Sequence, residues 1–266
     1  MTLKTAVLQY NPTDNKNENL RVIEDLLRQA AASGARFVVL PEYAIYTVDT
    51  MDQRFVDSAE PVDGPAVARI SELSAELDLA IVVGLNETAT DERIHNTLVG
   101  IDRGEIKAIY RKVHLYDAFG YKESDRVIAA EPGNGDVFEV DGFTVGMQTC
   151  YDLRFPEVSR MLVDRGATVL ALPAEWVPGP LKEFHWNTLI RARAIENTAY
   201  VVAADQCAPT GAGQSAIIDP MGIALAQVGE AVGVGIADIS KARLDSVRTT
   251  NPALTLRRYR VGLADG

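Results

Sequence analysis

Residues 143–157 read FTVGMQTCYDLRFPE, an apolar run that changes at Cys150 into a polar, turn-forming segment. The first half is typical of a buried β-strand, and Pro156 followed by Glu157 is typical of the first turn of a helix. We therefore expect Cys150 between the carboxyl end of a strand and the amino end of a helix, where the thiol pKa is lowered and the sulfur is exposed. A small buried core cysteine is the alternative interpretation.

Two more strand ends carry reactive side chains. Residues 37–40 predict a buried strand that runs towards Glu42, and residues 106–111 predict a strand that runs into Lys112. Strand carboxyl ends in a layered α/β fold form one rim where ligands bind, so Glu42, Lys112 and Cys150 are expected to converge there. Taken singly, Glu42 also fits a capped loop carboxylate and Lys112 a solvated surface charge.

Together these residues resemble the carbon–nitrogen hydrolases of the nitrilase superfamily, over nearly the whole chain. The matching segments are Pro41–Glu42 for the base, Arg111–Asp117 for the lysine, Thr149–Glu157 for the nucleophile, and further Gly166–Pro173, His185–Trp186, Arg191–Asn197 and Asp219–Gly222. The later segments look closest to the branch of deaminated-glutathione amidases and omega-amidases. Cys150-Tyr-Asp in place of Cys-Trp-Glu also points to an amidase, whereas Gly213-Gln-Ser departs from the family's frequent Gly-His-Ser.

This resemblance implies a fold and an activity. The fold is an α/β four-layer α-β-β-α sandwich with mixed sheets, formed by residues 1–266 as one domain, and members commonly pair as homodimers across an outer helical layer. The activity is hydrolysis of a small amide to a carboxylic acid and ammonia, with Glu42 as base, Lys112 as oxyanion ligand and Cys150 as the nucleophile that forms a thioester. An N-carbamoyl amide hydrolase and a nitrilase are the alternatives within the superfamily.

The proposed chemistry sets conditions on the site. Because glutamate and cysteine have reference pKa values of about 4.3 and about 8.5, burial must raise the pKa of Glu42 and Lys112 must lower that of Cys150. The backbone N–H of Tyr151 is expected to join Lys112 at the oxyanion. Trp176 follows another strand end, and it either walls the acyl pocket or packs in the core.

A second glutamate is also implied by the resemblance. Glu123 lies in the segment 122–125, which precedes Pro132-Gly133 and resembles the family's segment for this residue. It would hold Lys112 or the amide nitrogen of the substrate. Glu131 is the other candidate, and a solvated loop remains the third interpretation.

Bulk composition excludes several partners. The 266 residues include 26 basic and 37 acidic side chains, for a net charge of -11, so nucleic acid and anionic membranes are poor partners. The two cysteines, Cys150 and Cys207, form no disulfide framework, which fits a cytoplasmic protein. The chain shows no signal-peptide pattern and no run near the ~18 apolar residues of a membrane span.

Apolar periodicity predicts alternating helices and strands. Helices are expected over residues 17–32, 66–77, 156–165 and 186–197, and strands over 5–9, 80–83, 168–172, 200–204 and 216–219. Arg103-Gly104 and Asp141-Gly142 each separate two short apolar runs and predict hairpins. The C-terminal segment 251–266, which is basic as far as Val261, is expected either to dock on a partner subunit or to form a solvated tail.

Competing functions have weaker support in the sequence. A papain-like pair would join Cys150 to His114 or His185. The histidines, at 95, 114 and 185, lack the spacing of a metal site, and no cofactor is implied. Residues 211–216 match a dinucleotide-binding fingerprint but precede a strand, so they are interpreted as a glycine-rich turn. A non-catalytic binding protein with the same fold is the alternative from another class.

Overall fold

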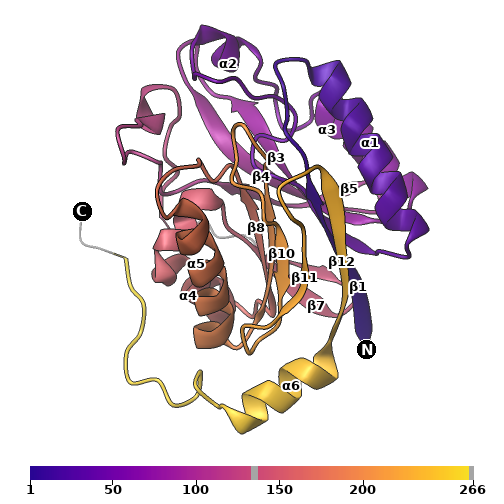
Figure 1. Cartoon of the computed structure of the whole chain (residues 1–266), viewed down its shortest axis with the longest axis vertical. Helices are drawn as coiled ribbons and strands as arrows, with labels where there is room; N and C mark the ends of the chain where they lie inside the picture. Colours follow the sequence, from indigo (N-terminus) through magenta and orange to yellow (C-terminus); the bar gives the residue numbers. More distant parts are fainter. Residues whose placement is uncertain (133–136, 264–266) are drawn as a thin grey trace.

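The computed structural model describes residues 1–132 and 137–263, and its centre consists of two stacked six-stranded sheets (Figure 1). The first sheet has the order β12-β1-β2-β3-β4-β5, with strands β12 (Gly233–Ser240), β1 (Thr2–Gln9), β2 (Phe37–Val39), β3 (Ala80–Thr88), β4 (Ile94–Asp102) and β5 (Glu105–Arg111). The second has the order β11-β10-β9-β8-β7-β6, with strands β11 (Ala224–Gln227), β10 (Ala216–Ile218), β9 (Tyr200–Asp205), β8 (Val169–Ala174), β7 (Phe143–Met147) and β6 (Val137–Val140).

Both sheets are mixed, with a parallel centre and antiparallel flanks. In the first sheet β1, β2 and β3 are parallel to one another. Strand β12 is antiparallel to β1, β4 is antiparallel to β3, and β5 is antiparallel to β4. In the second sheet β7, β8 and β9 are parallel. The carboxyl ends of β2, β5, β7 and β8 carry the residues of the site described below, because β2 and β5 run in the same direction in the first sheet, as β7 and β8 do in the second.

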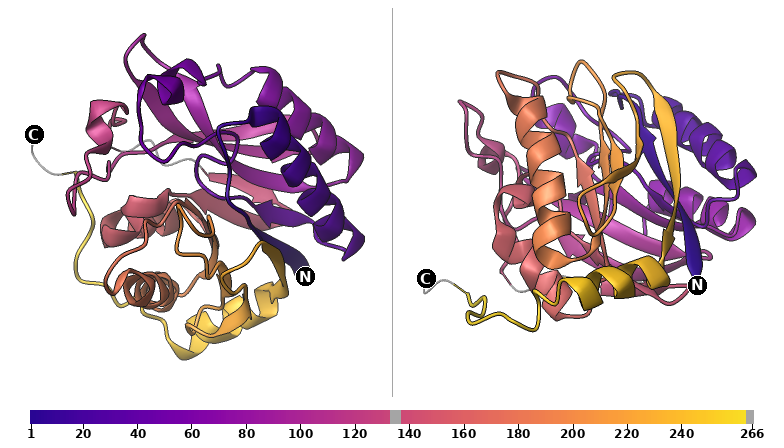
Figure 2. Two further views of the ribbon diagram at one scale, coloured as in Figure 1. Left: turned by 45° about the horizontal axis from the view of Figure 1, so that its top comes forward. Right: turned by 60° about the horizontal axis from the view of Figure 1, so that its bottom comes forward.

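Helices cover the outer face of each sheet (Figure 2). Helices α1 (Lys16–Ala32) and α3 (Pro65–Glu76) pack on the first sheet, and α4 (Pro156–Asp164) and α5 (Lys182–Asn197) pack on the second. The other elements are the helices α2 (Gln53–Asp57) and α6 (Lys241–Thr250) and the 3-10 turns η1 (Glu123–Asp125) and η2 (Cys150–Arg154). The four-layer α-β-β-α sandwich expected from the sequence is confirmed.

Strand periodicity explains why both faces of each sheet are apolar. Phe37 and Val39 of β2 point towards the second sheet, whereas Val38 points towards α1 and α3. In the second sheet Val169 faces the first sheet and Leu170 faces the helices. Because side chains alternate along a strand, a strand buried on both faces must be apolar at every position.

The expected elements are present, with shifted boundaries. Both hairpin turns are confirmed, since residues 103–104 and 141–142 all have positive φ values. Helix α5 begins at Lys182, four residues before the expected start, and η2 separates Cys150 from α4. The sequence does not predict strands β11 and β12 or helix α6. The two strands are half-exposed, and their sequences show only a weak apolar alternation.

The chain beyond α6 leaves the body as an extended arm (Figure 1). Leu256 and Tyr259 on this arm are 69% and 91% exposed, and Arg257 pairs with Asp164 of α4 at 2.5 Å. The last three residues of the expected segment 251–266 lie outside the described part of the chain. In that described part, the helices are too short or too polar to cross a membrane.

Candidate active site

Four strand ends meet at one pocket between the two sheets. Glu42 follows β2 and Lys112 follows β5 in the first sheet, while Cys150 follows β7 and Glu175 follows β8 in the second. All four line this pocket together with Tyr43, Met51, Tyr116, Tyr121, Glu123 and Val177. The structure therefore brings together the three reactive side chains that the sequence placed at separate strand ends.

Lys112 pairs with two of the three glutamates that line this pocket. Its Nζ atom lies 2.8 Å from Oε1 of Glu42 and 2.9 Å from Oε2 of Glu123, and all three side chains are at most 2% exposed. The amide of Asn96 donates to Oε1 of Glu42 at 2.6 Å and to Oε1 of Glu123 at 3.2 Å. Such a network fixes each carboxylate, because a buried charge needs partners for its hydrogen-bonding atoms.

The two candidate second glutamates differ in burial and in contacts. Glu123 begins η1, and it accepts from the hydroxyl of Tyr43 at 2.7 Å and from the backbone N–H of Tyr116 at 2.6 Å. Glu131 is exposed. Glu123 thus contacts Lys112, and the solvated-loop interpretation of Glu123 is wrong. Gly133, part of the sequence pattern, lies outside the described residues.

Cys150 occupies a constrained turn. It has a left-handed φ of 40°, and its sulfur lies 3.5 Å from the backbone oxygen of Glu175. The buried carboxylate of Asp152 holds the turn by accepting from the backbone N–H of Thr149 at 2.9 Å and from the hydroxyl of Tyr110 at 2.6 Å. A non-glycine residue keeps such a backbone conformation only where its surroundings enforce it.

The histidines do not pair with the thiol. His114 Nδ1 lies 2.8 Å from Oδ1 of Asp152, and its ring stacks on Phe155 at 3.7 Å. His185 Nδ1 lies 3.4 Å from a guanidinium nitrogen of Arg154. His114 therefore supports the turn that carries Cys150, and the geometry disfavours a papain-like pair.

Comparisons with known proteins identify the family of this chain and agree with its fold. Residues 4–249 match the family model described as carbon-nitrogen hydrolase. The chain belongs to the carbon–nitrogen hydrolase family. This hydrolase is 39% identical to a deaminated glutathione amidase of Escherichia coli O157:H7 over 256 residues, which is 96% of this chain and 97% of the relative. A deaminated glutathione amidase of Bos taurus is 33% identical, over 95% of this chain and 81% of the relative.

Solved structures give the same result. The NitFhit protein of C. elegans superimposes with a TM-score of 0.89 at 28% identity, covering 98% of this hydrolase and 66% of that longer chain. The NitN amidase of a Nesterenkonia species superimposes with a TM-score of 0.79 at 25% identity, covering 96% of each chain. A variant of that amidase carries an acetamide moiety covalently on its active-site cysteine. These relatives support amidase activity on a small amide for this hydrolase.

Burial sets the protonation states in the hydrolase site. Desolvation raises the pKa of Glu42 despite the opposing charge of Lys112, as expected from the sequence. Burial would lower the pKa of Lys112, but the charges of Glu123 and Glu42 outweigh it and raise that pKa well above its usual value. The hydrolase therefore holds Lys112 as a permanent cation beside two carboxylates.

The expectation for the thiol is wrong. Cys150 is only 6% exposed, and burial together with the charge of Glu42 raises its pKa well above the usual value, although Lys112 opposes this shift. The physical reason is that desolvation exceeds the effect of a single cation, and that Cys150 begins the short 3-10 turn η2 and not the helix α4. The resting side chain of Cys150 is therefore a thiol.

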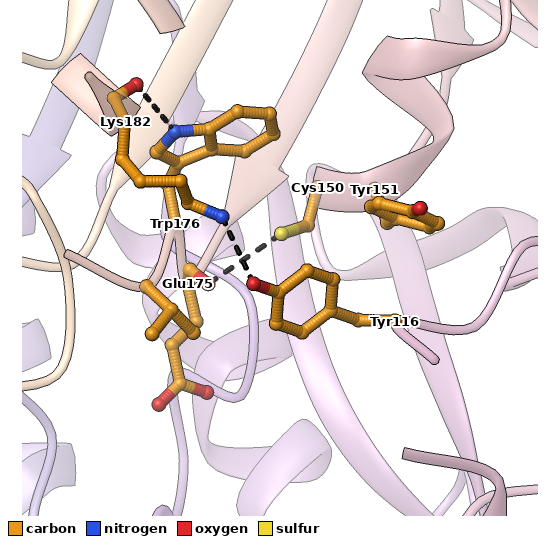
Figure 3. A pocket seen from close by; sticks show the side chains of 7 residues that line it. Tyr116, Cys150, Tyr151, Glu175, Trp176 and Lys182 are labelled. Atoms are coloured by element: carbon orange, nitrogen blue, oxygen red, sulfur yellow. Dashed lines mark hydrogen bonds between the residues drawn. The ribbon is translucent and has the colours of Figure 1, made fainter. Parts of the chain in front are cut away.

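Tyr151 and Trp176 lie to either side of Cys150 in Figure 3. They line a narrow pocket with Cys150, and the indole N–H of Trp176 donates to the backbone oxygen of Lys182 at 2.8 Å. Trp176 also packs on Trp186, with ring centroids 5.5 Å apart. Trp176 therefore packs in the core and also lines a pocket beside Cys150.

Several site residues were missed by the sequence reasoning. Asn96 stands as a polar residue inside an apolar strand, and Glu175 directly follows a strand, so each carried a weak signal. Burial and the charges of Glu42 and Glu123 hold the pKa of Glu175 well above its usual value. Lys182 had no signal, because a charged residue near a helix start usually faces solvent.

Proposed function

We propose that this hydrolase cleaves a small linear amide to a carboxylic acid and ammonia through a thioester on Cys150. The observation that carries the proposal is the buried cluster of Glu42, Lys112 and Glu123 in the pocket that Cys150 also lines. A base, a fixed cation and a nucleophile at one point are the requirements of acyl transfer to sulfur.

The first half of the reaction forms the acyl-enzyme. The sulfur of Cys150 attacks the amide carbonyl carbon while Glu42 accepts the thiol proton. Lys112 and the backbone N–H of Tyr151 stabilise the oxyanion, and Glu42 returns the proton to the departing nitrogen. Ammonia leaves as the carbon–nitrogen bond breaks.

The second half releases the acid. Glu42 takes a proton from a water molecule, whose oxygen attacks the thioester carbonyl, and the sulfur departs with that proton. Glu123 keeps Lys112 in position and faces the side of the leaving nitrogen. Tyr151 and Trp176 form the wall that contacts the acyl group.

We also propose that the hydrolase is a homodimer in the cytoplasm. Residues 1–266 of each subunit form one hydrolase domain. The exposed apolar side chains Leu256 and Leu263 on the C-terminal arm support docking of the segment 251–266 on a partner subunit. Two free, buried cysteines support a reducing compartment. The net charge of -11 disfavours nucleic acid as a partner.

An ammonia-release screen tests the reaction. Short aliphatic amides, omega-amides of keto acids, deaminated peptides and N-carbamoyl compounds are each incubated with the wild-type hydrolase. We expect ammonia from at least one amide class, complete loss in Cys150→Ala, and a loss of about a hundredfold or more in Lys112→Ala, because the oxyanion loses its cation.

Cys207→Ala is the matched control, since Cys207 is also buried but does not line the pocket. Its rate should stay near that of the wild type. Turnover by Cys150→Ala comparable to the wild-type rate would contradict the thioester mechanism.

A further inference from the structure

A buried carboxyl group that the proposed mechanism does not use lies at the end of β9. Asp205 is the last residue of this strand, pairs with Ala174 of β8, and is fully buried. Its Oδ1 atom accepts from the backbone N–H of Trp176 at 2.7 Å. Its Oδ2 atom has no hydrogen-bond partner within residues 1–132 and 137–263. A buried carboxyl group with an unsatisfied oxygen lowers stability, so its bond to Trp176 is the feature to explain.

The peptide group that Asp205 holds also contacts the nucleophile. The backbone oxygen of Glu175 lies 3.5 Å from the sulfur of Cys150 (Figure 3). This oxygen and the N–H of Trp176 belong to one planar peptide group and point in opposite directions. The hydrogen bond from Trp176 to Asp205 therefore sets the direction in which the oxygen faces the sulfur.

The same backbone segment contacts the base. The N–H of Glu175 donates to Oε2 of Glu42 at 2.8 Å. Gln206, which follows Asp205, adds two bonds, because its side-chain amide donates to the backbone oxygen of Glu42 at 2.8 Å and its N–H donates to the oxygen of Ala174 at 3.1 Å. The end of β9 thus binds the segment of residues 174–176 and the backbone that carries the base.

Asp205 is itself held in place by the chain before β10. The hydroxyl of Ser215 accepts from the backbone N–H of Asp205 at 2.9 Å and donates to its backbone oxygen at 3.2 Å. Ser215 is fully buried, and its own N–H donates to the side chain of Gln9 at 2.9 Å. A side chain can position other groups only when its own backbone is fixed, and these bonds meet that condition.

We propose that Asp205 is a positioning residue, which orients the peptide group between Glu175 and Trp176 and thereby aligns Glu42 and Cys150 for proton transfer. This inference rests on the proposed amidase function, which gives Glu42 and Cys150 their roles. Asp205 is absent from the lining of both pockets beside the sulfur, so it acts through the peptide group and not on the substrate. Proton transfer depends on the distance and direction between donor and acceptor, so a small rotation of this segment lowers the rate.

Removal of the side chain tests this role through the pH profile. In Asp205→Ala the N–H of Trp176 loses its acceptor, the segment turns, and Glu42 loses the hydrogen bond from Glu175. That bond favours the ionised carboxylate, so its loss should raise the pKa of Glu42 and move the acid limb of kcat/KM upwards by about 0.5–1 pH unit. We expect kcat to fall by about ten- to a hundredfold, with a much smaller change in KM. The other groups that act on the pKa of Glu42 stay in place: Lys112, Glu123 and Asn96.

Asp205→Asn separates positioning from general damage. Burial raises the pKa of Asp205 well above its usual value, so at neutral pH the side chain is an uncharged acid that asparagine resembles in shape. The amide oxygen of the variant can accept from the N–H of Trp176. We therefore expect Asp205→Asn to keep the acid limb in place and kcat within about threefold of the wild type.

Asp102→Ala is the matched control. Asp102 is also a buried aspartate, but it pairs with Arg36 at 2.6 Å and lies beside Ala80, the first residue of β3, at the opposite end of the strands. This variant should lose stability and keep the acid limb, whose position does not depend on the fraction of folded enzyme. Asp205→Ser, with a shorter side chain, replaces Asp205→Ala if the latter does not fold. An unchanged limb and kcat in the shortened variant, or equal losses in Asp205→Asn, would overturn the positioning role.

Amide hydrogen exchange separates this inference from the reaction. Nuclear magnetic resonance of the isotope-labelled hydrolase follows the N–H groups of Glu175 and Trp176. In Asp205→Ala both should exchange faster by about tenfold or more, and in Asp205→Asn both should stay protected. Faster exchange at Trp176 alone would show that the segment keeps its place without Asp205, and would overturn the inference. The expected exchange in a protein that releases ammonia from none of the amides would instead contradict only the proposed reaction.

Discussion

At the scale of single residues, the protonation state of the Glu42 carboxyl group depends on opposing effects on its pKa. Burial raises its pKa, and Lys112 and the hydrogen bond from Asn96 lower it, with the net result above the usual 4.5. The thiol of Cys150 stays protonated at neutral pH. In the proposed mechanism Glu42 accepts the thiol proton while the sulfur–carbon bond forms.

The pH dependence of kcat/KM should report this glutamate. Glu42 is a base only when ionised, so activity is present above its raised pKa and is lost as the pH falls through that value. We expect the acid limb of the profile above pH 4.5. In Asn96→Ala the carboxylate loses a hydrogen bond at 2.6 Å, so the limb should move to higher pH.

The exposed Asn17 offers the control Asn17→Ala, which should leave the profile unchanged. An acid limb that does not move in Asn96→Ala would show that another group controls the rate at low pH.

At the scale of elements, β3 packs directly against the segment that carries Glu42. A Cβ atom built on Gly84 would lie 2.7 Å from the backbone nitrogen of Tyr43 and 2.9 Å from the Cα atom of Glu42. Real Cβ atoms do not approach backbone so closely. Glycine at this point of β3 therefore allows the base to sit against the sheet.

Gly84→Ala should damage stability and activity together. The added methyl group must push the backbone at Glu42 away, which should lower the free energy of unfolding by about 1–3 kcal/mol and reduce kcat, because the base moves from its partners. Denaturant unfolding and ammonia release measure the two effects.

The matched control is Gly229→Ala, where a Cβ atom would meet nothing within 4 Å. This change should alter the free energy of unfolding by less than about 0.5 kcal/mol. Wild-type kcat in Gly84→Ala would disprove the inferred coupling between β3 and the base.

At the scale of the whole molecule, the site depends on the stacking of the two sheets. The first sheet supplies Glu42 and Lys112, and the second supplies Cys150 and Glu175. The backbone N–H of Glu175 donates to Oε2 of Glu42 at 2.8 Å, which links the two halves at the reacting point. Neither sheet alone forms the site.

The C-terminal arm provides a prediction at the same scale. Deletion of residues 251–266 should shift the proposed homodimer towards monomer, because the arm presents exposed apolar side chains including Leu256 and Leu263. Sedimentation velocity measures the change. Arg257→Ala, which removes only the ion pair with Asp164, serves as the milder comparison. An unchanged sedimentation coefficient distribution after the deletion, beyond the small loss of mass, would exclude the arm from the interface.

The sequence alone determined most of the strands, the helices α1, α3, α4 and α5, and the three strand-end residues Glu42, Lys112 and Cys150, because periodicity and turn residues are local properties. Only the tertiary structure decided between Glu123 and Glu131, reversed the expected pKa shift of Cys150, and revealed Lys182 beside the sulfur. Desolvation and charge pairing depend on atoms that are far apart in the chain and meet only when the sheets stack, so no local pattern encodes them.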